Sequence, residues 1–344
     1  MKTIALYLPQ FHTIPENDKW WGKGFTEWTN VQKARAWFPG HYQPHVPHPA
    51  VGYYSLENQS FIEQQHAMAL RYGVGAFCYY YYNFAGHTIL GKPLEIINNS
   101  PRIQNEFCLC WANHDWTRAW YGQGKELLIQ QTYSLAEAQD TIEDLCRYFV
   151  NPRYIKINGK PLLLVFSPAS IPMMREYREI WDRHVRGLGF EGLYLVNLEM
   201  LEQGIDPAVY GFDAALEFAP DWVCAAHLPK EPDCPRRVDY AETVKRMMQK
   251  PVPPYLRMRS VFANWDNTPR YNNAGLVFEN TSLGAFRFFT EYALQYTRDH
   301  LPDYLQYVFI NAWNEWGEGC HLEPDAKNGF LPLEIVRDAL RVAT

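Results

Sequence analysis

The feature that most constrains the fold of this chain is the repeated alternation of short β-forming runs with longer segments of helical periodicity. The runs are rich in branched and aromatic residues and are bounded by turn-forming residues, which is typical of strands. Eight such runs are present, at residues 3–8, 75–81, 106–111, 161–166, 193–198, 214–218, 260–263 and 307–313. Because parallel strands need long crossover connections, the alternation indicates a parallel sheet built from βα units.

The segments between these runs carry apolar residues at spacings of three and four, which predicts helices. Six patterns are strong, at residues 61–71, 135–150, 173–186, 240–249, 283–299 and 333–342, and two are weaker, at 91–98 and 203–210. Eight strand and helix pairs that close on themselves form a barrel whose active site lies at the carboxyl ends of the strands. We therefore predict an α/β fold in which residues 1–344 form a single (β/α)₈ TIM barrel domain with long strand-to-helix loops over its C-terminal face.

The longest predicted loop spans residues 12–56 and is rich in Trp, Pro, His and Gly. Loops of this length without regular structure are uncommon in compact domains and are usually functional. We expect this loop to cover the mouth of the barrel.

Charge and composition narrow the possible partners. The net charge is -6 with Lys and Arg scattered along the chain, which argues against nucleic acid or an anionic membrane surface as partner. No run approaches the about 18 apolar residues of a membrane span, and the N-terminus lacks the pattern of a signal peptide, so we expect a cytoplasmic protein unless a leader has been removed. An oligo- or polysaccharide substrate remains possible, and the oligomeric state stays open. The seven cysteines fit reduced thiols better than a disulfide framework.

Residues 308–325, VFINAWNEWGEGCHLEPD, form an apolar run that stops in carboxylates, tryptophans and glycines. Gly317 and Gly319 allow a tight turn that can bring the carboxylates of Glu315 and Glu318 to one pocket. Cleavage of a glycosidic bond needs a proton donor for the leaving oxygen and a second group that stabilises the sugar carbon. Glu315 and Glu318 are therefore the candidate catalytic residues, and a solvated acidic turn is the alternative.

A sugar site also needs aromatic walls, because sugar rings present apolar faces between their hydroxyl groups. Aromatic residues make up 16% of the chain, and many tryptophans fall near the predicted strand ends, although about half of them could pack beneath loops. Candidate substrate-binding residues follow the predicted strands or lie in the first long loop, and they are Trp28, Trp111, Asn113, Asp115, Trp265, Asp266, Asn314 and Trp316.

Other chemistries have weaker support in the sequence. The histidines His12, His114 and His321 do not have the spacing of a metal site, and we expect neither a metal nor a cofactor. The chain has no glycine-rich phosphate loop and no GxSxG elbow for a serine nucleophile. Glu323 and Asp325 are interpreted as structural or peripheral, because Pro324 and the turn that follows lead away from the strand end.

Six segments together carry a resemblance to a known family. They are IALYLPQFHTIPENDKWWGKGFTEWTNV at 4–31, WANHDWTRAW at 111–120, KPLLLVFSP at 160–168, GFDAALEF at 211–218, NWDNTPR at 264–270 and INAWNEWGEGCHLEPD at 310–325. Over nearly its whole length the chain resembles the WbsX-like proteins of bacterial polysaccharide gene clusters, which have a glycoside hydrolase family 99-like domain.

The resemblance implies a (β/α)₈ barrel that acts inside α-mannosyl chains with retention of configuration, and its catalytic NEWxEG segment matches residues 314–319. By position, Glu315 would deprotonate the 2-hydroxyl of the sugar, giving a 1,2-anhydro sugar. Glu318 would act as general acid and then as general base. Family 99 hydrolases usually have His where this chain has Gly317, which leaves the substrate open.

Three functions follow as hypotheses. The first is a retaining α-glycoside hydrolase, endo-acting on a mannose- or rhamnose-containing polysaccharide. The second is a glycosyltransferase or transglycosidase of cell-surface, O-antigen-type polysaccharide biosynthesis, because WbsX-like proteins often carry a glycosyltransferase label. The third is a glycan-binding module without catalysis.

Overall fold

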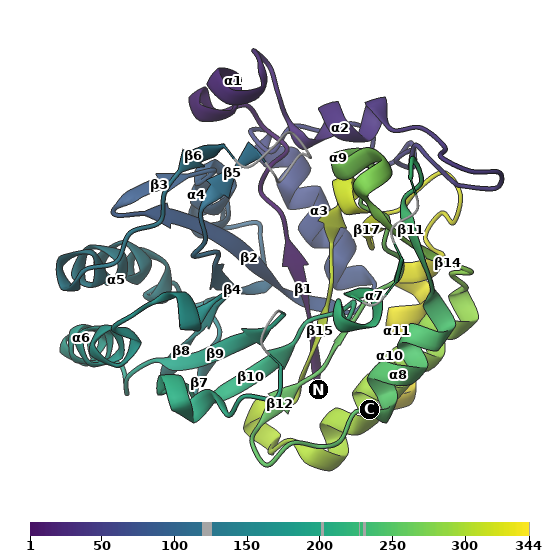
Figure 1. The fold of residues 1–344 in the computed structure, drawn as a ribbon. Helices are drawn as coiled ribbons and strands as arrows, with labels where there is room; N and C mark the ends of the chain where they lie inside the picture. The colour runs from purple at the N-terminus through teal and green to yellow at the C-terminus, as the bar shows by residue number, and fades with distance from the viewer. Residues whose placement is uncertain (119–125, 201–202, 227, 230–231, 344) are drawn as a thin grey trace.

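A barrel of parallel strands forms the centre of the computed structural model, which describes residues 1–118, 126–200, 203–226, 228–229 and 232–343 (Figure 1). Its strands, in chain order, are β1 (Lys2–Tyr7), β2 (Val74–Phe84), β4 (Glu106–Trp111), β8 (Lys160–Val165), β9 (Tyr194–Glu199), β10 (Ala214–Glu217), β12 (Arg257–Met258), β13 (Ser260–Val261) and β15 (Tyr307–Ile310). They are hydrogen-bonded in the order β12-β10-β9-β8-β4-β2-β1-β15-β13. Every neighbouring pair on this path is parallel, as the alternation of runs and helices predicts.

The barrel closes through the strand that the sequence predicts at 260–263. This strand is split around Arg259 into β12, which pairs with β10, and β13, which pairs with β15. β12 and β13 are therefore the two ends of the path, and the chain joins them through Arg259. All eight predicted runs are strands of this barrel, and the prediction of a TIM barrel fold is confirmed.

Helices surround the strands (Figure 1), and the residues that they bury are mostly apolar. These helices are α3 (Gln59–Arg71), α4 (Lys92–Asn99), α5 (Leu135–Phe149), α6 (Met174–Gly187), α8 (Tyr240–Gln249), α10 (Leu283–His300) and α11 (Leu331–Ala343). Several begin at a side chain that caps the helix N-terminus: Ser134 accepts a hydrogen bond from the Glu137 amide, and Ser282 accepts one from the Ala285 amide. The weak prediction at 91–98 is confirmed by α4.

The helix predicted at 203–210 is wrong. The structure has only a short 3₁₀ helix there, η3 (Pro207–Tyr210). Pro207 can begin a helix but donates no backbone hydrogen bond, and Gly211, at φ 79°, ends the turn in the left-handed region. A segment of four residues is too short to form a stable α-helix against the barrel.

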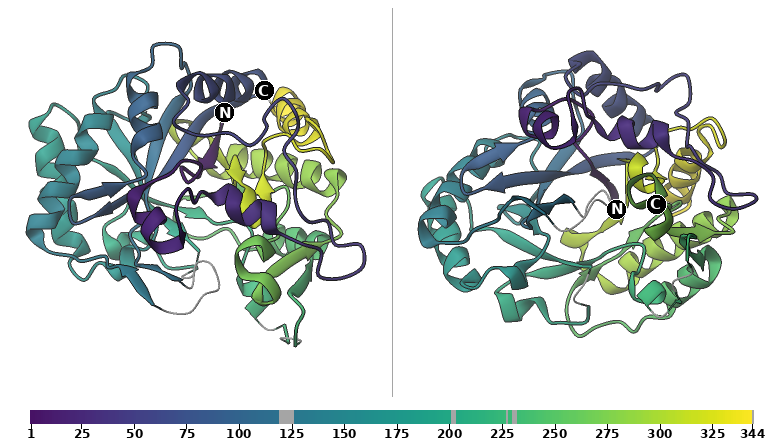
Figure 2. Two further views of the ribbon diagram at one scale, coloured as in Figure 1. Left: turned by 90° about the horizontal axis from the view of Figure 1, so that it is seen from above. Right: turned by 45° about the horizontal axis from the view of Figure 1, so that its top comes forward.

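The long N-terminal connection is more ordered than the sequence predicts. It contains α1 (Pro15–Trp21), which begins at a proline and ends at Gly22, and α2 (Glu27–Lys33), which begins at Thr26. Thr26 is the N-cap residue of a capping box. In Figures 1 and 2, α1 and α2 lie at the same end of the barrel as α9 (Thr268–Tyr271). The expectation that this segment lies over the barrel mouth is therefore met by two short helices with connecting loops.

Shorter elements complete the rim and the outer edge of the barrel. They are the strands β3 (His87–Ile89), β5 (Trp116–Thr117), β6 (Leu127–Ile129), β7 (Lys156–Ile157), β11 (Arg236–Asp239), β14 (Leu276–Glu279), β16 (Asn314–Glu315) and β17 (Cys320–His321), the helix α7 (Val223–Ala226), and the 3₁₀ helices η2 (Pro168–Ser170), η4 (Asn272–Ala274), η5 (Asp303–Leu305) and η6 (Trp316–Glu318). Within the described ranges, no helix combines the length and the apolar character that crossing a membrane requires.

Candidate active site

The two candidate glutamates lie on one tight turn just beyond a barrel strand. β15 ends at Ile310, and β16 then pairs antiparallel with β17, so that η6 connects the two short strands. In a 3₁₀ turn, side chains three residues apart lie on the same side, which brings Glu315 and Glu318 together. Gly319 ends the turn at φ 59°, and a Cβ there would lie 3.1 Å from backbone atoms of Asp266. The glycine is therefore required by both conformation and space.

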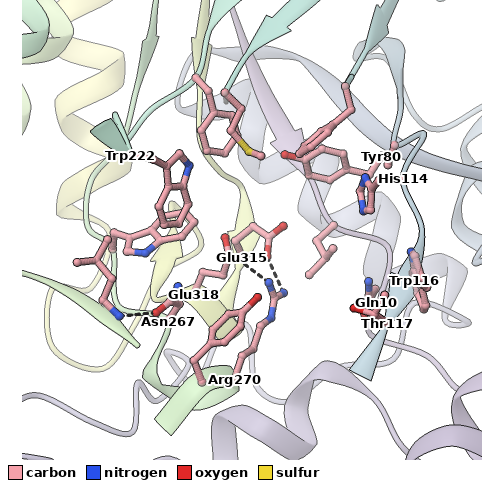
Figure 3. Close-up of a pocket in the computed structure, with 18 of the residues that line it drawn as sticks. Gln10, Tyr80, His114, Trp116, Thr117, Trp222, Asn267, Arg270, Glu315 and Glu318 are labelled. Carbon is pink, nitrogen blue, oxygen red and sulfur yellow. Dashed lines mark hydrogen bonds and ion pairs between the residues drawn. The ribbon is translucent and has the colours of Figure 1, made fainter. Parts of the chain in front are cut away.

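Glu315 and Glu318 both line a cavity of about 320 Å³ at the carboxyl ends of the barrel strands (Figure 3). Leu8 and Gln10 follow β1, His114 follows β4 and Phe166 follows β8, and each of them contributes to the wall. The remaining lining side chains include Tyr80, Tyr82, Trp116, Met200, Phe218, Trp222, Trp265, Arg270 and Tyr271. The cavity is therefore aromatic on most sides, with a carboxyl pair at one point of its wall.

Arg270 binds both glutamates at once. Its Nη1 donates to Glu318 Oε1 at 2.7 Å, and its Nη2 donates to Glu315 Oε2 at 2.9 Å. The Nε of the same guanidinium donates to Glu27 Oε1 at 2.9 Å. Figure 3 shows the guanidinium beside the carboxyl groups of Glu315 and Glu318, with dashed lines that mark these contacts. Three carboxyl groups therefore share one cation in a buried position.

Burial favours the protonated form of the carboxyl pair. The pKa of Glu318 is raised to about 8, first by burial and then by the charges of Glu315 and Glu27, while Arg270 opposes the rise. Burial likewise raises the pKa of Glu315, against the effect of Arg270. At neutral pH the cluster therefore holds a proton on Glu318, which is the state that a general acid needs.

The aromatic wall comes from several loops. The rings of Trp222 and Trp265 meet edge to face, with their centroids 4.6 Å apart. On another part of the wall, Tyr82 and Trp116 also meet edge to face, at 5.2 Å. Flat ring faces and edges of this kind suit the apolar faces of a sugar.

A second, more polar cavity adjoins the first. The two share His114, Thr117 and Tyr271 in their walls. The second cavity is also lined by Asn113 and Asp115, two of the predicted substrate-binding residues. The side chain of Asn113 bonds to both the amide and the carbonyl oxygen of Ser167, and Asp115 accepts a hydrogen bond from the Gln131 amide at 2.7 Å. Both residues therefore also hold the loops that form this wall.

Of the predicted substrate-binding residues, Trp265 lines the first cavity. Among the residues that the structure describes, five others line neither cavity. These five are Trp28, Trp111, Asp266, Asn314 and Trp316. Trp28 lies in α2, whereas the other four stand at or near the end of a strand with their side chains outside the lining of both cavities. Their predicted contact with substrate gains no support from the structure.

Each of the five has protein partners that account for its position. Asn314 bonds to the amide and the carbonyl of Leu8, and so fixes the turn to the end of β1. The indole nitrogen of Trp316 donates to Glu323 at 2.7 Å, that of Trp28 donates to the Tyr54 carbonyl, and that of Trp111 donates to the Asn83 carbonyl.

Asp266 lies 2.7 Å from His41 Nε2 and accepts a bond from Gln43. Burial alone would raise the pKa of Asp266, but hydrogen bonds from His41 and Thr268 hold it below its usual value.

Glu323 is structural, as its position in the sequence suggests. It is enclosed, and its carboxylate accepts hydrogen bonds from Tyr54, Gln65, Trp313 and Trp316. Burial raises the pKa of Glu323 to about 7, against the effect of these bonds. It does not line either cavity of the described residues.

Several residues of the site are not predicted by the sequence. Arg270 and Glu27 stand 243 positions apart in the chain, so spacing gives no signal of their contact. Arg270 could have been suspected as a basic residue soon after the strand at 260–263, where the other predicted site residues are aromatic or acidic. Tyr80 and Tyr82 alternate with Tyr79 and Tyr81 on β2, and alternation predicts that two of the four share a face, but not which two.

One group of described residues has donor atoms close enough together to hold a metal ion: His45, His321 and Asp325, within 4.8 Å of one another. His45 Nδ1 lies 2.9 Å from His321 Nε2, and His321 Nδ1 lies 3.0 Å from the Glu323 carbonyl oxygen. Asp325 accepts hydrogen bonds from Asn328. Hydrogen bonds account for these three side chains, and we assign no metal to them.

Comparisons with known proteins agree with this fold. A family model described as "Glycosyltransferase WbsX" matches residues 3–336. The chain belongs to the WbsX family. Over 343 residues it is 40% identical to proteins named "Uncharacterized protein WxcX" from two strains of Xanthomonas campestris pv. campestris, covering 98% of this chain and 49% of theirs. It spans about half the length of these curated relatives.

Solved structures with the same fold are more distant in sequence. The WbsX chain matches the GH99 endo-alpha-mannosidase from Bacteroides thetaiotaomicron with a TM-score of 0.63 at 15% identity, over 99% of this chain and 97% of that one. A "Glycoside hydrolase-like protein" matches with a TM-score of 0.63 at 12% identity, over 98% and 93% of the two chains. At these identities the similarity establishes a common barrel fold.

Proposed function

We propose that this WbsX chain is a glycoside hydrolase that cleaves α-linked mannose- or rhamnose-containing polysaccharide with retention of configuration. The observation that carries the proposal is the carboxyl pair: Glu315 and Glu318 line one aromatic cavity and share Arg270, and the pKa of Glu318 is raised to about 8, mainly by burial. A protonated and an ionisable carboxyl in one cavity are the two groups that glycoside cleavage requires.

In the proposed mechanism, Glu318 protonates the leaving oxygen while the glycosidic bond breaks. Glu315 accepts the proton of the 2-hydroxyl, whose oxygen attacks the anomeric carbon and forms a 1,2-anhydro sugar. Glu318, now ionised, takes a proton from water, whose oxygen attacks the anomeric carbon and opens the three-membered ring. Glu315 returns its proton to the 2-oxygen as the ring opens, so both carboxyl groups regain their starting states. The 2-hydroxyl attacks intramolecularly at high effective concentration, so that no enzyme nucleophile is needed. This route requires a 2-hydroxyl trans to the leaving group, as α-mannosides and α-rhamnosides have.

The shape of the site supports cleavage within a chain of sugars. The polar second cavity continues from the first through His114, Thr117 and Tyr271, so a substrate longer than one sugar could occupy both. The similarity in fold to an endo-alpha-mannosidase is consistent with this proposal.

The experiment is to incubate the purified protein with a panel of α-mannans, α-rhamnans and related bacterial polysaccharides. Chromatography should detect internal cleavage as oligosaccharides of several lengths, and proton NMR should detect the retained α-anomer as the first product. A first product with the β-configuration would contradict the mechanism. The absence of cleavage across the panel, with the protein folded, would contradict the function.

Transfer is the second candidate, and the family description favours it. A transferase would move a sugar from an activated donor to an acceptor glycan, and the same carboxyl pair could serve the acceptor hydroxyl. Calorimetry with nucleotide sugars and polyprenyl-phosphate sugars separates the two proposals. Binding of such a donor, followed by transfer to an acceptor, would replace hydrolysis as the assigned function.

A further inference from the structure

A third carboxyl group, that of Glu27, shares Arg270 with the carboxyl pair but lies outside the cavity wall. Glu27 is the first residue of α2, in the long N-terminal connection, and its side chain is 0% exposed. Its amide donates to the Gln10 carbonyl at 3.0 Å, which fixes the beginning of α2 next to the chain that follows β1. An ionisable side chain this deeply buried is rare without a charged partner, and Arg270 is that partner.

The contact occupies one particular edge of the Arg270 guanidinium. Glu27 binds Nε, which leaves Nη1 for Glu318 and Nη2 for Glu315. Since the guanidinium is planar and rigid, fixing its Nε edge also fixes the direction of its other two nitrogens. Without Glu27, the group could rotate and bind either catalytic carboxyl through a different edge.

The sequence of the catalytic turn is adapted to this contact. A Cβ added at Gly317 would lie 1.9 Å from Glu27 Oε1 and 2.9 Å from Arg270 Nε. Any side chain at position 317 would therefore occupy the place of the Glu27 carboxylate. Gly317 does not have a positive φ, so the requirement for glycine is one of space and not of backbone conformation.

We infer that Glu27 is a positioning residue of the active site, which holds Arg270 toward Glu315 and Glu318, and that Gly317 is glycine in order to admit it. The inference rests on the proposed function for its catalytic meaning. The geometry itself can be tested without a substrate.

Glu27 also acts on the pair through its charge. Its carboxylate raises the pKa of both Glu315 and Glu318, in each case after the larger effect of burial. Burial raises the pKa of four groups near the pair, which stay neutral while the carboxyls titrate: Tyr80, Tyr82, Tyr271 and Cys320. Burial lowers the pKa of His114, in the same cavity wall, to about 4, so that this side chain is also neutral over that range. A purely structural Glu27 would stabilise the fold without governing this titration.

The first test is carbon-13 NMR of labelled glutamate carboxyl carbons during a pH titration. In Glu27→Gln, the titration midpoints of Glu315 and Glu318 should both move to lower pH by about one unit, because one negative charge is removed beside them. Glu143→Gln, at an exposed glutamate of α5, is the matched control and should leave both midpoints in place. Unchanged midpoints in a folded Glu27→Gln protein would overturn the inference.

The second test measures whether positions 27 and 317 depend on each other. Gly317→Ala should lower the thermal unfolding midpoint of the parent protein, because the new methyl group displaces Glu27. In a Glu27→Ala background, the same change should lower the midpoint much less, because the space is free. Equal decreases in both backgrounds would contradict the spatial argument. This test needs only parent, single and double variants that unfold measurably. It therefore still tests the inference in the case that Glu27→Gln does not fold.

The third test applies once a cleaved glycan is known. Glu27→Gln should lower kcat with little change in KM and should move the alkaline limb of the pH profile to lower pH, whereas Glu27→Asp should restore part of the rate. A rise in KM alone would overturn the positioning role. If the parent protein cleaves no glycan, the proposed function fails, while the first two tests still decide the position of Glu27.

Discussion

Two buried arginines, Arg259 and Arg270, lie in opposite kinds of charge environment. Arg259 binds Glu217 at 2.7 Å, and Lys250 binds the same carboxylate at 3.0 Å, so the cations equal or exceed the anions there. The guanidinium of Arg259 also lies 4.2 Å from the ring centre of Tyr296, on α10. Arg270 instead is shared by three carboxyl groups at the edge of the cavity.

The difference separates charges that hold the fold from charges that can do chemistry. Arg259 belongs to an ion cluster between the barrel and its outer helices, where each carboxylate contacts a cation. Around Arg270 the carboxyl groups outnumber the cation, and burial penalises each ionised form, so that one of them keeps a proton at neutral pH. The protonated carboxyl lies where a ligand can reach it.

The largest expected effect tests the carboxyl cluster around Arg270. Glu318→Gln removes the proton donor while preserving the shape of the side chain, and turnover of a cleaved glycan should fall by about 10²- to 10⁴-fold. Circular dichroism and the unfolding midpoint should remain close to those of the parent. Glu143→Gln serves as the control in the same assay. Turnover of Glu318→Gln close to that of the parent would remove Glu318 from the mechanism.

The second largest expected effect tests the ion cluster around Arg259. Arg259→Met leaves Glu217 buried with Lys250 as its remaining cation, and the free energy of unfolding should fall by about 3–5 kcal/mol. Arg246→Met, in an exposed pair on α8, should change it by about 0.5 kcal/mol or less. Urea unfolding measures both values. Turnover per folded molecule should not change in Arg259→Met, and its loss would show that the two clusters are not separate.

A third prediction uses the pH dependence of stability. The pKa of Glu318 is about 8 in the folded protein, above its ordinary value, so the folded state binds this proton more tightly. Its contribution is fully present below about pH 4.5 and is lost as the pH rises toward 8. The unfolding free energy of the parent should therefore decrease relative to that of Glu318→Gln over this range. Glu323 titrates in both proteins, so its effect cancels in the difference. Parallel pH curves would indicate that the cluster holds no extra proton.

Much of the fold and part of the site follow from the sequence alone. The eight strand runs are predicted because barrel strands are buried on both faces and therefore read as continuous apolar segments. The proximity of Glu315 and Glu318 can be predicted because one local turn determines the relative position of their side chains. The contact of Glu27 with Arg270 depends on how segments 243 positions apart meet, and no local pattern encodes that. For Trp111 and Trp265, both close to strand ends, the sequence does not determine which of them faces the opening.

The smallest expected effect extends the comparison to these two tryptophans. Trp265 lines the cavity and meets Trp222 edge to face, whereas Trp111 packs against Tyr177 and Trp181 beneath α6. Trp265→Phe keeps a ring but reduces the surface offered to a sugar, and KM should rise about threefold to tenfold, which corresponds to about 1 kcal/mol. Trp111→Phe should leave KM unchanged and lower the unfolding midpoint instead, because it shortens a side chain in the packed core. Steady-state kinetics and thermal unfolding of both variants test this contrast. If Trp111→Phe changed KM and Trp265→Phe changed only stability, the assignment of the two tryptophans would have to be reversed. Trp111 would then belong to the substrate site and Trp265 to the packed core.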